Sequence, residues 1–405
     1  MALILMVVIA AIVCVSVFLY IQKSNTKVSQ SGIKQNVNTE FDGIYEMNDY
    51  VVYGETLTLY QNAYDGKATD PMQGNNLMLR NIETDQLTSF TFSGKVDSGI
   101  DMSSLEEGIY ELYTYDHYQK QRIFFSDAIQ AKNLITMRNQ GVVKKVKFVA
   151  NKDALKDYDV ELERNYAFLF VTNQKPNKKI YDVVIDPTGN SVDYQTQYVD
   201  YGGSSYLMDE QVTSLAFAKT VKKQLESYGL KVKILRKENE TIGYYEDDSR
   251  ISRAYVSGAK LYLTLGASLD EDVNAPYILV SPYTNSTLGN RIAYMFTQNG
   301  LNLYNARTDK TQEMGVLSDS FTMNNNYEYT QLEMYPQLRE SGGKATYAGN
   351  VYGNSEYSTA YGMYGIYFVF ASVNNSESVT NFNTNQKQMA KYLVKGICDY
   401  FDIKG

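Results

Sequence analysis

The sequence predicts a chain of three parts: an apolar N-terminal helix, an all-β sandwich, and an α/β domain whose sheet is mostly parallel. Three observations predict these parts. An uncharged apolar run opens the chain, apolar residues then alternate with a period of two, and strand and helix patterns alternate in the second half. At 405 residues the chain is longer than one ordinary domain and has room for an anchor and two domains.

Residues 1–21 predict a single transmembrane anchor. Residues 2–20 are uncharged and almost wholly apolar, and a helix of about 20 such residues spans the hydrocarbon core of a bilayer. No basic region precedes this run and no small-residue cleavage site follows it, which argues against a cleaved signal peptide. Residues 22–41 are polar and lack apolar periodicity, so they predict a flexible stalk.

Residues 42–178 predict an all-β sandwich of immunoglobulin-like type. Short alternating runs stand at 55–60, 89–92, 109–113 and 122–125, with clusters of Gly, Asn, Asp and Ser between them. No catalytic spacing occurs there, and we expect a spacer or docking domain.

Residues 179–405 predict the layered α/β domain. Strands are expected at 181–186, 231–235, 261–265 and 365–372, and helices at 210–228, 249–258, 286–299 and 385–401. Regular alternation of strands and helices is typical of a mostly parallel sheet covered by helices.

Composition and charge exclude some partners and chemistries. With 38 Lys and Arg against 46 Asp and Glu, the net charge of -8 argues against nucleic acid as a partner. The two cysteines, Cys14 and Cys398, give no disulfide framework. The single histidine, His117, lies in the β region, where we expect a surface turn. A His-rich metal site or a His-based mechanism is therefore excluded from the C-terminal half.

Five short motifs follow one another in the α/β domain. The first strand ends in Asp-Pro-Thr-Gly-Asn at 186–190, the next helix begins at Glu210, and Arg250 opens the helix after that. A later strand ends in Thr-Leu-Gly-Ala-Ser at 264–268, and an apolar helix closes the chain. In this order, across residues 180–403, they resemble the zinc-dependent N-acetylmuramoyl-L-alanine amidases of bacterial cell walls. In that family the two strands end in Asp-Pro-Gly-His-Gly-Gly and Ser-Ile-His-Ala-Asn.

The resemblance implies a zinc site whose ligands this sequence lacks. Such amidases bind zinc through two His and one Glu, and a further Glu acts as general base. In our alignment the two His fall on Gly189 and Gly266, the ligand Glu is kept as Glu210, and the base falls on Val369. Glycine has no side chain that can bind a metal, so we expect no zinc, no other cofactor and no catalysis.

A substitute cation site would need oxygen ligands. Asp186, Asp209 and Glu210 could offer them to Ca²⁺ or Mg²⁺. Acids after strands and at helix starts more often cap backbone N–H groups, and we expect that role for all three. The acidic segment 244–248 is expected to cap the helix that follows it.

The sequence therefore predicts a membrane-anchored, extracytoplasmic pseudo-amidase that acts as a scaffold or regulator in the bacterial envelope by binding an envelope protein. Lys23 and Lys27 would by charge alone place the body in the cytoplasm, and the amidase resemblance decides against that orientation. The alternatives are a peptidoglycan-binding module and an active amidase with a non-standard site.

An apparent insertion at 324–361 is the predicted partner-contact region, and a plain surface loop is the alternative. Tyrosine combines apolar area with a polar tip and is enriched in contact surfaces. The tyrosines in question are Tyr327, Tyr329, Tyr335, Tyr347, Tyr352 and Tyr357.

Overall fold

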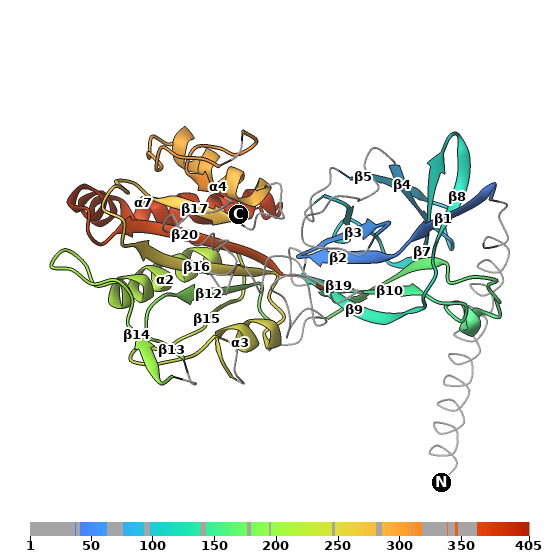
Figure 1. Ribbon diagram of the computed structural model, residues 1–405, viewed down its shortest axis with the longest axis horizontal. Helices are drawn as coiled ribbons and strands as arrows, with labels where there is room; N and C mark the ends of the chain where they lie inside the picture. The colour runs from blue at the N-terminus through green and yellow to red at the C-terminus, as the bar shows by residue number, and fades with distance from the viewer. Residues whose placement is uncertain are drawn as a thin grey trace, which may run out of the picture.

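The computed structural model describes residues 37, 41–62, 76–92, 98–137, 143–175, 180–193, 196–244, 248–280, 286–308, 310–317, 338, 345–346 and 363–404. The predicted anchor and nearly all of the predicted stalk lie outside these residues. Within the described residues, no helix combines the length and the apolar character needed to cross a membrane. The described parts form two bodies that lie side by side (Figure 1).

The first body is built from two β-sheets. The larger has the order β1-β8-β7-β11-β10-β9, with β4 and β5 branching from β7, and the smaller has the order β19-β2-β3-β6. The larger sheet comprises β1 (Gly43–Met47), β4 (Asn76–Asn81), β5 (Leu87–Thr91), β7 (Gly108–Asp116), β8 (Gln119–Phe125), β9 (Ile129–Met137), β10 (Val143–Ala150) and β11 (Ala167–Gln174). The smaller comprises β2 (Asp49–Tyr53), β3 (Thr56–Tyr60), β6 (Ile100–Asp101) and β19 (Ala345–Thr346).

One apolar core joins the two sheets. Tyr50 and Leu57 of the smaller sheet belong to the same buried cluster as Leu112 and Phe148 of the larger one. The regular structure described between residues 41 and 175 consists of strands and one short 3₁₀ helix (Lys156–Tyr158), in agreement with the predicted all-β region. The immunoglobulin-like strand order stays a prediction.

The second body is a six-stranded sheet covered by helices. Its order is β15-β12-β16-β20-β17-β18, and the pairings are parallel except that between β17 and β20. The strands are β12 (Val183–Pro187), β15 (Val232–Ile234), β16 (Leu261–Ser268), β17 (Tyr277–Val280), β18 (Val316–Leu317) and β20 (Tyr364–Ser372). The predicted layered domain with a mostly parallel sheet is confirmed.

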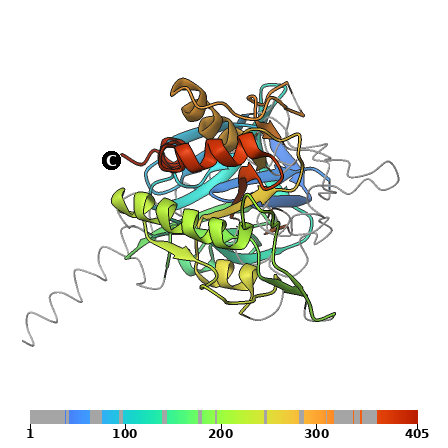
Figure 2. The same cartoon turned by 90° about the vertical axis from the view of Figure 1, so that its left-hand side faces the viewer.

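Helices pack on both faces of this sheet. Buried residues of α2 (Glu210–Ser227), α4 (Thr287–Gln298) and α7 (Ser376–Tyr400) share one large cluster with β16 and β20. Residues of α3 (Arg250–Val256) pack with Val184 and Tyr262 on the opposite face. Figure 2 shows α2 and α7 running across the near end of the body. A hairpin of β13 (Ser191–Asp193) and β14 (Tyr198–Asp200) projects beyond the sheet.

The two bodies meet at the amino ends of the parallel strands. Val51 and Tyr60 of the smaller β-sheet belong to the large core cluster of the second body. Lys260, just before β16, forms an ion pair with Glu55 at 3.7 Å, and both residues are buried. The carboxyl ends of the strands therefore lie away from the first body, and the predicted site residues lie there.

Candidate functional site

Three of the four predicted site positions come together at the carboxyl ends of two neighbouring strands. β12 and β16 pair in register up to Pro187 and Leu265, so the residues that follow on each strand are neighbours. The backbone N–H of Thr188 donates to the carbonyl of Leu265 at 3.0 Å. α2 begins at Glu210, whose side chain reaches this point. Gly189, Glu210 and Gly266 thus surround one place, as the alignment predicts.

The carboxylate of Glu210 is buried and accepts three hydrogen bonds from the protein. One oxygen, Oε1, accepts from the Thr188 hydroxyl at 2.6 Å and from the Ala267 backbone N–H at 2.8 Å. The other, Oε2, accepts from the Gly203 backbone N–H at 2.7 Å. The prediction that Glu210 caps the first helix turn is therefore wrong: its side chain joins the loop after β12, the loop before α2 and the end of β16.

The space beside Gly266 is filled. A Cβ atom at this position would lie 2.2 Å from the Tyr367 hydroxyl oxygen and 2.7 Å from the Thr188 hydroxyl oxygen. At Gly189 the backbone has φ +80°, and a Cβ would lie 2.7 Å from the Tyr201 carbonyl oxygen. A longer side chain at either position would displace these neighbours.

Val369 lies directly across the strand pair from Gly266. It is buried in an apolar cluster with Tyr277, Leu279 and Tyr367. Its surroundings are those of a core residue, and it presents no group that can take a proton.

The residues at this place do not fit a zinc ion. Glu210 is the one carboxylate among the aligned positions, and both of its oxygens already accept from protein donors. In the described part of the chain, no cluster of three His, Cys, Asp or Glu side chains is suited to hold a metal. The histidine of the chain, His117, lies at a β7–β8 turn of the first body, paired with Asp116 at 2.8 Å, so its predicted turn position is confirmed.

Asp186 forms a buried ion pair with Arg250 beneath this site. Both side chains are fully buried, and Asp186 also accepts from the Tyr262 hydroxyl at 2.6 Å. Arg250 in addition donates to the carbonyl oxygens of Pro187 at 2.9 Å and Gly189 at 2.6 Å. The expectation that Asp186 caps a loop is wrong, because a buried carboxylate needs a charged partner and Arg250 supplies it.

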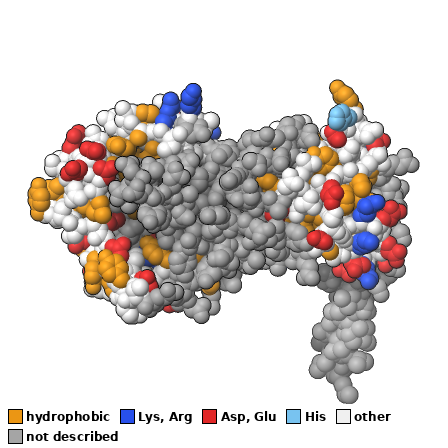
Figure 3. Space-filling view, viewed as in Figure 1, with side chains coloured by type: hydrophobic (Ala, Val, Ile, Leu, Met, Phe, Trp, Pro, Cys, Tyr) orange, Lys and Arg blue, Asp and Glu red, His pale blue; other side chains and the backbone are white. Residues whose placement is uncertain are grey.

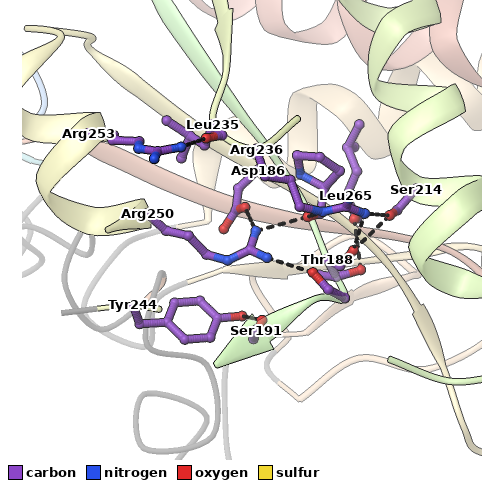
Figure 4. A network of polar contacts seen from close by, with 12 residues as sticks. Asp186, Thr188, Ser191, Ser214, Leu235, Arg236, Tyr244, Arg250, Arg253 and Leu265 are labelled. Atoms are coloured by element: carbon purple, nitrogen blue, oxygen red, sulfur yellow. Dashed lines mark hydrogen bonds and ion pairs between the residues drawn. The ribbon is translucent and has the colours of Figure 1, made fainter. Parts of the chain in front are cut away.

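Arg236 also binds the loop that follows β12, the loop bound by Arg250 (Figure 4). It donates to the carbonyl oxygens of Thr188 at 2.8 Å, Pro187 at 3.1 Å and Gln211 at 2.6 Å. Burial, and next the charge of Arg250, lower the pKa of the Arg236 guanidinium to about 10. The group therefore remains protonated at neutral pH. Sequence reasoning missed Arg236, because nothing in its local pattern shows that it points under the loop.

The other acidic residues at helix starts, Asp209 and Asp248, each make a local contact at their own helix. Asp209 caps α2 by accepting from the Val212 backbone N–H at 3.1 Å, which confirms its predicted role. Asp248 instead forms two hydrogen bonds of 2.9 Å with Arg253 of α3. The capping prediction for it is therefore wrong, while residues 245–247 lie outside the described residues.

The predicted partner-contact tyrosines are not among the residues that the structure describes. This holds for Tyr327, Tyr329, Tyr335, Tyr347, Tyr352 and Tyr357. Their contact role stays a prediction.

Comparison with known proteins gives matches among solved structures alone. No protein-family model and no curated protein matches the sequence. The catalytic domain of the N-acetylmuramoyl-L-alanine amidase CwlV from Bacillus (Paenibacillus) polymyxa var. colistinus matches with a TM-score of 0.35 and 18% identity, over 56% of this chain and 100% of that chain. The amidase Ami1 from Mycobacterium smegmatis matches with a TM-score of 0.38 and 10% identity, over 55% and 98%. The amidase CwlD from Clostridioides difficile, in complex with the GerS lipoprotein, matches with a TM-score of 0.35 and 12% identity, over 55% and 100%.

Proposed function

We propose that this chain is a non-catalytic, amidase-like protein of the bacterial cell envelope that acts by binding another envelope protein. In this proposal residues 2–20 anchor it in the membrane, and the two bodies form an extracytoplasmic scaffold or regulator. The chain needs neither zinc nor another cofactor.

The observation that carries the proposal is the bonding of Glu210. Protein donors take three of the roughly four acceptor positions of this carboxylate, and the aligned positions Gly189 and Gly266 supply no further ligand to hold an ion beside it. Thr188 and Tyr367 fill the space where a second ligand would stand. These contacts support the proposal that the residues at this place stabilise the fold and do not bind a metal ion.

Metal analysis and peptidoglycan digestion test the absence of catalysis. The full chain, purified from membranes in detergent, is analysed for zinc and incubated with peptidoglycan beside an active amidase as a positive control. We expect zinc well below one per chain and no release of stem peptides. Stoichiometric zinc together with released stem peptide would establish the active-amidase alternative and end the proposal.

A genetic experiment tests the scaffold role. Deletion of the coding sequence is expected to alter envelope assembly, and re-expression of the full chain should restore it. An unchanged envelope in the deletion strain would contradict a scaffold or regulatory role.

A groove of about 420 Å³ in the second body favours peptidoglycan binding as a second candidate function. Its lining includes the amides of Asn274, Asn302, Asn305 and Asn381, and amides can bond both sugar hydroxyls and peptide groups. Co-sedimentation of the full chain with sacculi tests this candidate. The pair Asn302→Ala and Asn381→Ala should reduce pelleting if the groove binds, and pelleting no greater than that of an inert protein would exclude it.

A further inference from the structure

Three loops at the carboxyl edge of the second sheet are tied to one another and form a continuous surface. The Ser205 hydroxyl donates to the Val373 carbonyl at 2.6 Å, which joins the loop before α2 to the loop after β20. The Asn374 amide donates to the Leu269 carbonyl at 2.7 Å, which joins the latter to the loop after β16. Asn375 makes a further bond to the Glu271 carbonyl at 2.7 Å. These bonds hold the surface in one arrangement.

This surface, which we call the edge surface, exposes large apolar side chains. They are Tyr198 (68% exposed), Tyr201 (60%), Tyr206 (94%), Val212 (63%) and Leu269 (64%). Among the described residues these make up five of the twelve exposed large hydrophobic side chains. Clustered exposed apolar groups mark interaction sites, whereas scattered single ones are ordinary.

The charges on the edge surface have one sign. The three segments that form it, residues 198–212, 268–276 and 373–381, contain no Lys or Arg. Apart from the buried Glu210, their acids are Asp200, Asp209, Asp270, Glu271, Asp272 and Glu377. Figure 3 shows apolar and acidic side chains intermingled at the left-hand end of the molecule, without basic ones among them.

We propose that the edge surface docks a protein segment in which Lys or Arg side chains stand beside apolar ones. Apolar side chains of the partner would cover Tyr206 and Leu269, and its cations would face the acids of the β16 loop. An anionic polymer of the cell wall would be repelled by the same acids. This inference rests on the proposed function, since it names the class of partner that the scaffold binds.

Site-specific photo-crosslinking in the native membrane tests this proposal. A photoreactive amino acid replaces Tyr206, or Leu269, in the full chain, and Tyr118 of the first body, which is at least as exposed as either, serves as the control. We expect both edge positions to crosslink to the same protein, at peptides that contain Lys or Arg, and Tyr118 not to do so. Crosslinks to glycan strands, to a second copy of the chain or to an acidic peptide would overturn the proposal.

A second experiment reverses the charge of two acidic residues on the edge surface. Glu271→Lys with Asp272→Lys should reduce the crosslinking yield at position 206 roughly tenfold, because attraction becomes repulsion. The control, Glu161→Lys with Glu163→Lys, reverses two exposed acids of the first body and should leave the yield unchanged. Equal yields in the two variants would exclude the edge surface.

The outcomes separate the two proposals. Absence of crosslinks in a protein that releases no stem peptide would reject the docking surface alone. Release of stem peptide would reject the proposed function whatever the crosslinks show.

Discussion

At the scale of single residues, the Glu210 carboxylate links segments that are far apart in the sequence. Its acceptor oxygens bond Thr188 in the loop after β12, Gly203 in the loop before α2, and Ala267 at the end of β16. The alignment predicted the positions of Glu210, Gly189 and Gly266 because motifs carry them. It could not predict Thr188 and Tyr367 as neighbours of Gly266, because that contact depends on the register of β16 with β12 and β20.

Replacing Glu210 should destabilise the second body strongly. In Glu210→Ala, the backbone N–H groups of Gly203 and Ala267 lose their acceptor in a buried place, and the Thr188 hydroxyl keeps only the Leu265 carbonyl, at 3.1 Å, as its acceptor. We expect the free energy of unfolding to fall by roughly 3–5 kcal/mol. Urea denaturation followed by circular dichroism measures it, since the chain contains no tryptophan.

Asp209→Ala is the matched control for this variant. It removes an adjacent carboxylate whose bond to Val212 caps α2, and losing a helix cap costs about 1 kcal/mol. A smaller loss for Glu210→Ala than for Asp209→Ala would contradict the bridging role.

Gly266→Ala tests the filling of the site. The added methyl group would overlap the Tyr367 hydroxyl, and we expect a loss of about 1–3 kcal/mol in the free energy of unfolding. Combining it with Tyr367→Phe, which removes that hydroxyl, should restore part of the loss. Denaturation of the four proteins in this double-mutant cycle gives the coupling energy, and simple additivity would show that the two side chains do not compete.

At the scale of elements, the structure differs from the sequence prediction in the strands β17 and β18, which were not predicted, and in the start of α7. The apolar pattern predicts a helix over 385–401, whereas α7 begins at Ser376. Its first turns are mostly polar, with Val379 and Phe382 as the buried apolar side chains there. Their weak periodicity hides this part of the helix, and the capping residue Asn375 marks its true beginning.

Asn375→Ala should therefore destabilise α7. The Asn375 side chain accepts from the Ser378 backbone N–H at 2.9 Å and donates to the Glu271 carbonyl at 2.7 Å. We expect a loss of about 1–2 kcal/mol, the cost of an N-cap together with one further hydrogen bond. Asn375→Ser keeps a capping hydroxyl and loses only the second bond, so it should lose less. Equal denaturation midpoints for Asn375→Ala and the wild type would contradict the cap.

α7 also carries Cys398, whose thiol should be unreactive in the folded chain. It is buried, and burial raises the pKa of the Cys398 thiol from 9.0 to about 12. The raised pKa keeps the thiol of the folded chain protonated at pH 8.5, and thiolate is the reactive form. Iodoacetamide at pH 8.5, with the Cys398 peptide followed by mass spectrometry, should label it only when urea unfolds the chain. Rapid labelling of the native protein would contradict this burial.

At the scale of the whole molecule, the two bodies share buried contacts that composition does not reveal. The alternating patterns separate a β region from an α/β region, yet they carry no signal for the ion pair of Glu55 with Lys260. The same holds for the Tyr364 ring, which lies against Gly54. Local periodicity reports which side of an element is apolar. It does not report which distant element covers that side.

Gly54→Ala should loosen the connection between the bodies. Gly54 has φ +54°, and a Cβ there would lie 2.1 Å from the Tyr364 ring. The β2–β3 turn must therefore move away from β20 or strain its backbone. Calorimetry of the wild type is expected to show one main transition, because Val51 and Tyr60 belong to the core of the second body.

The Gly54→Ala variant should show two separate unfolding transitions. The midpoint temperature of the lower one should fall by several degrees, because a loss of about 1–2 kcal/mol in the free energy of unfolding has this effect in domains of this size. Gly229→Ala is the control, since Gly229 also has positive φ (+80°) but has no neighbour within 4 Å. It strains the backbone without touching the contact between the bodies, so it should lower the transition temperature without splitting the transition. A single transition in both variants would show that the two bodies do not depend on this contact for their cooperative unfolding.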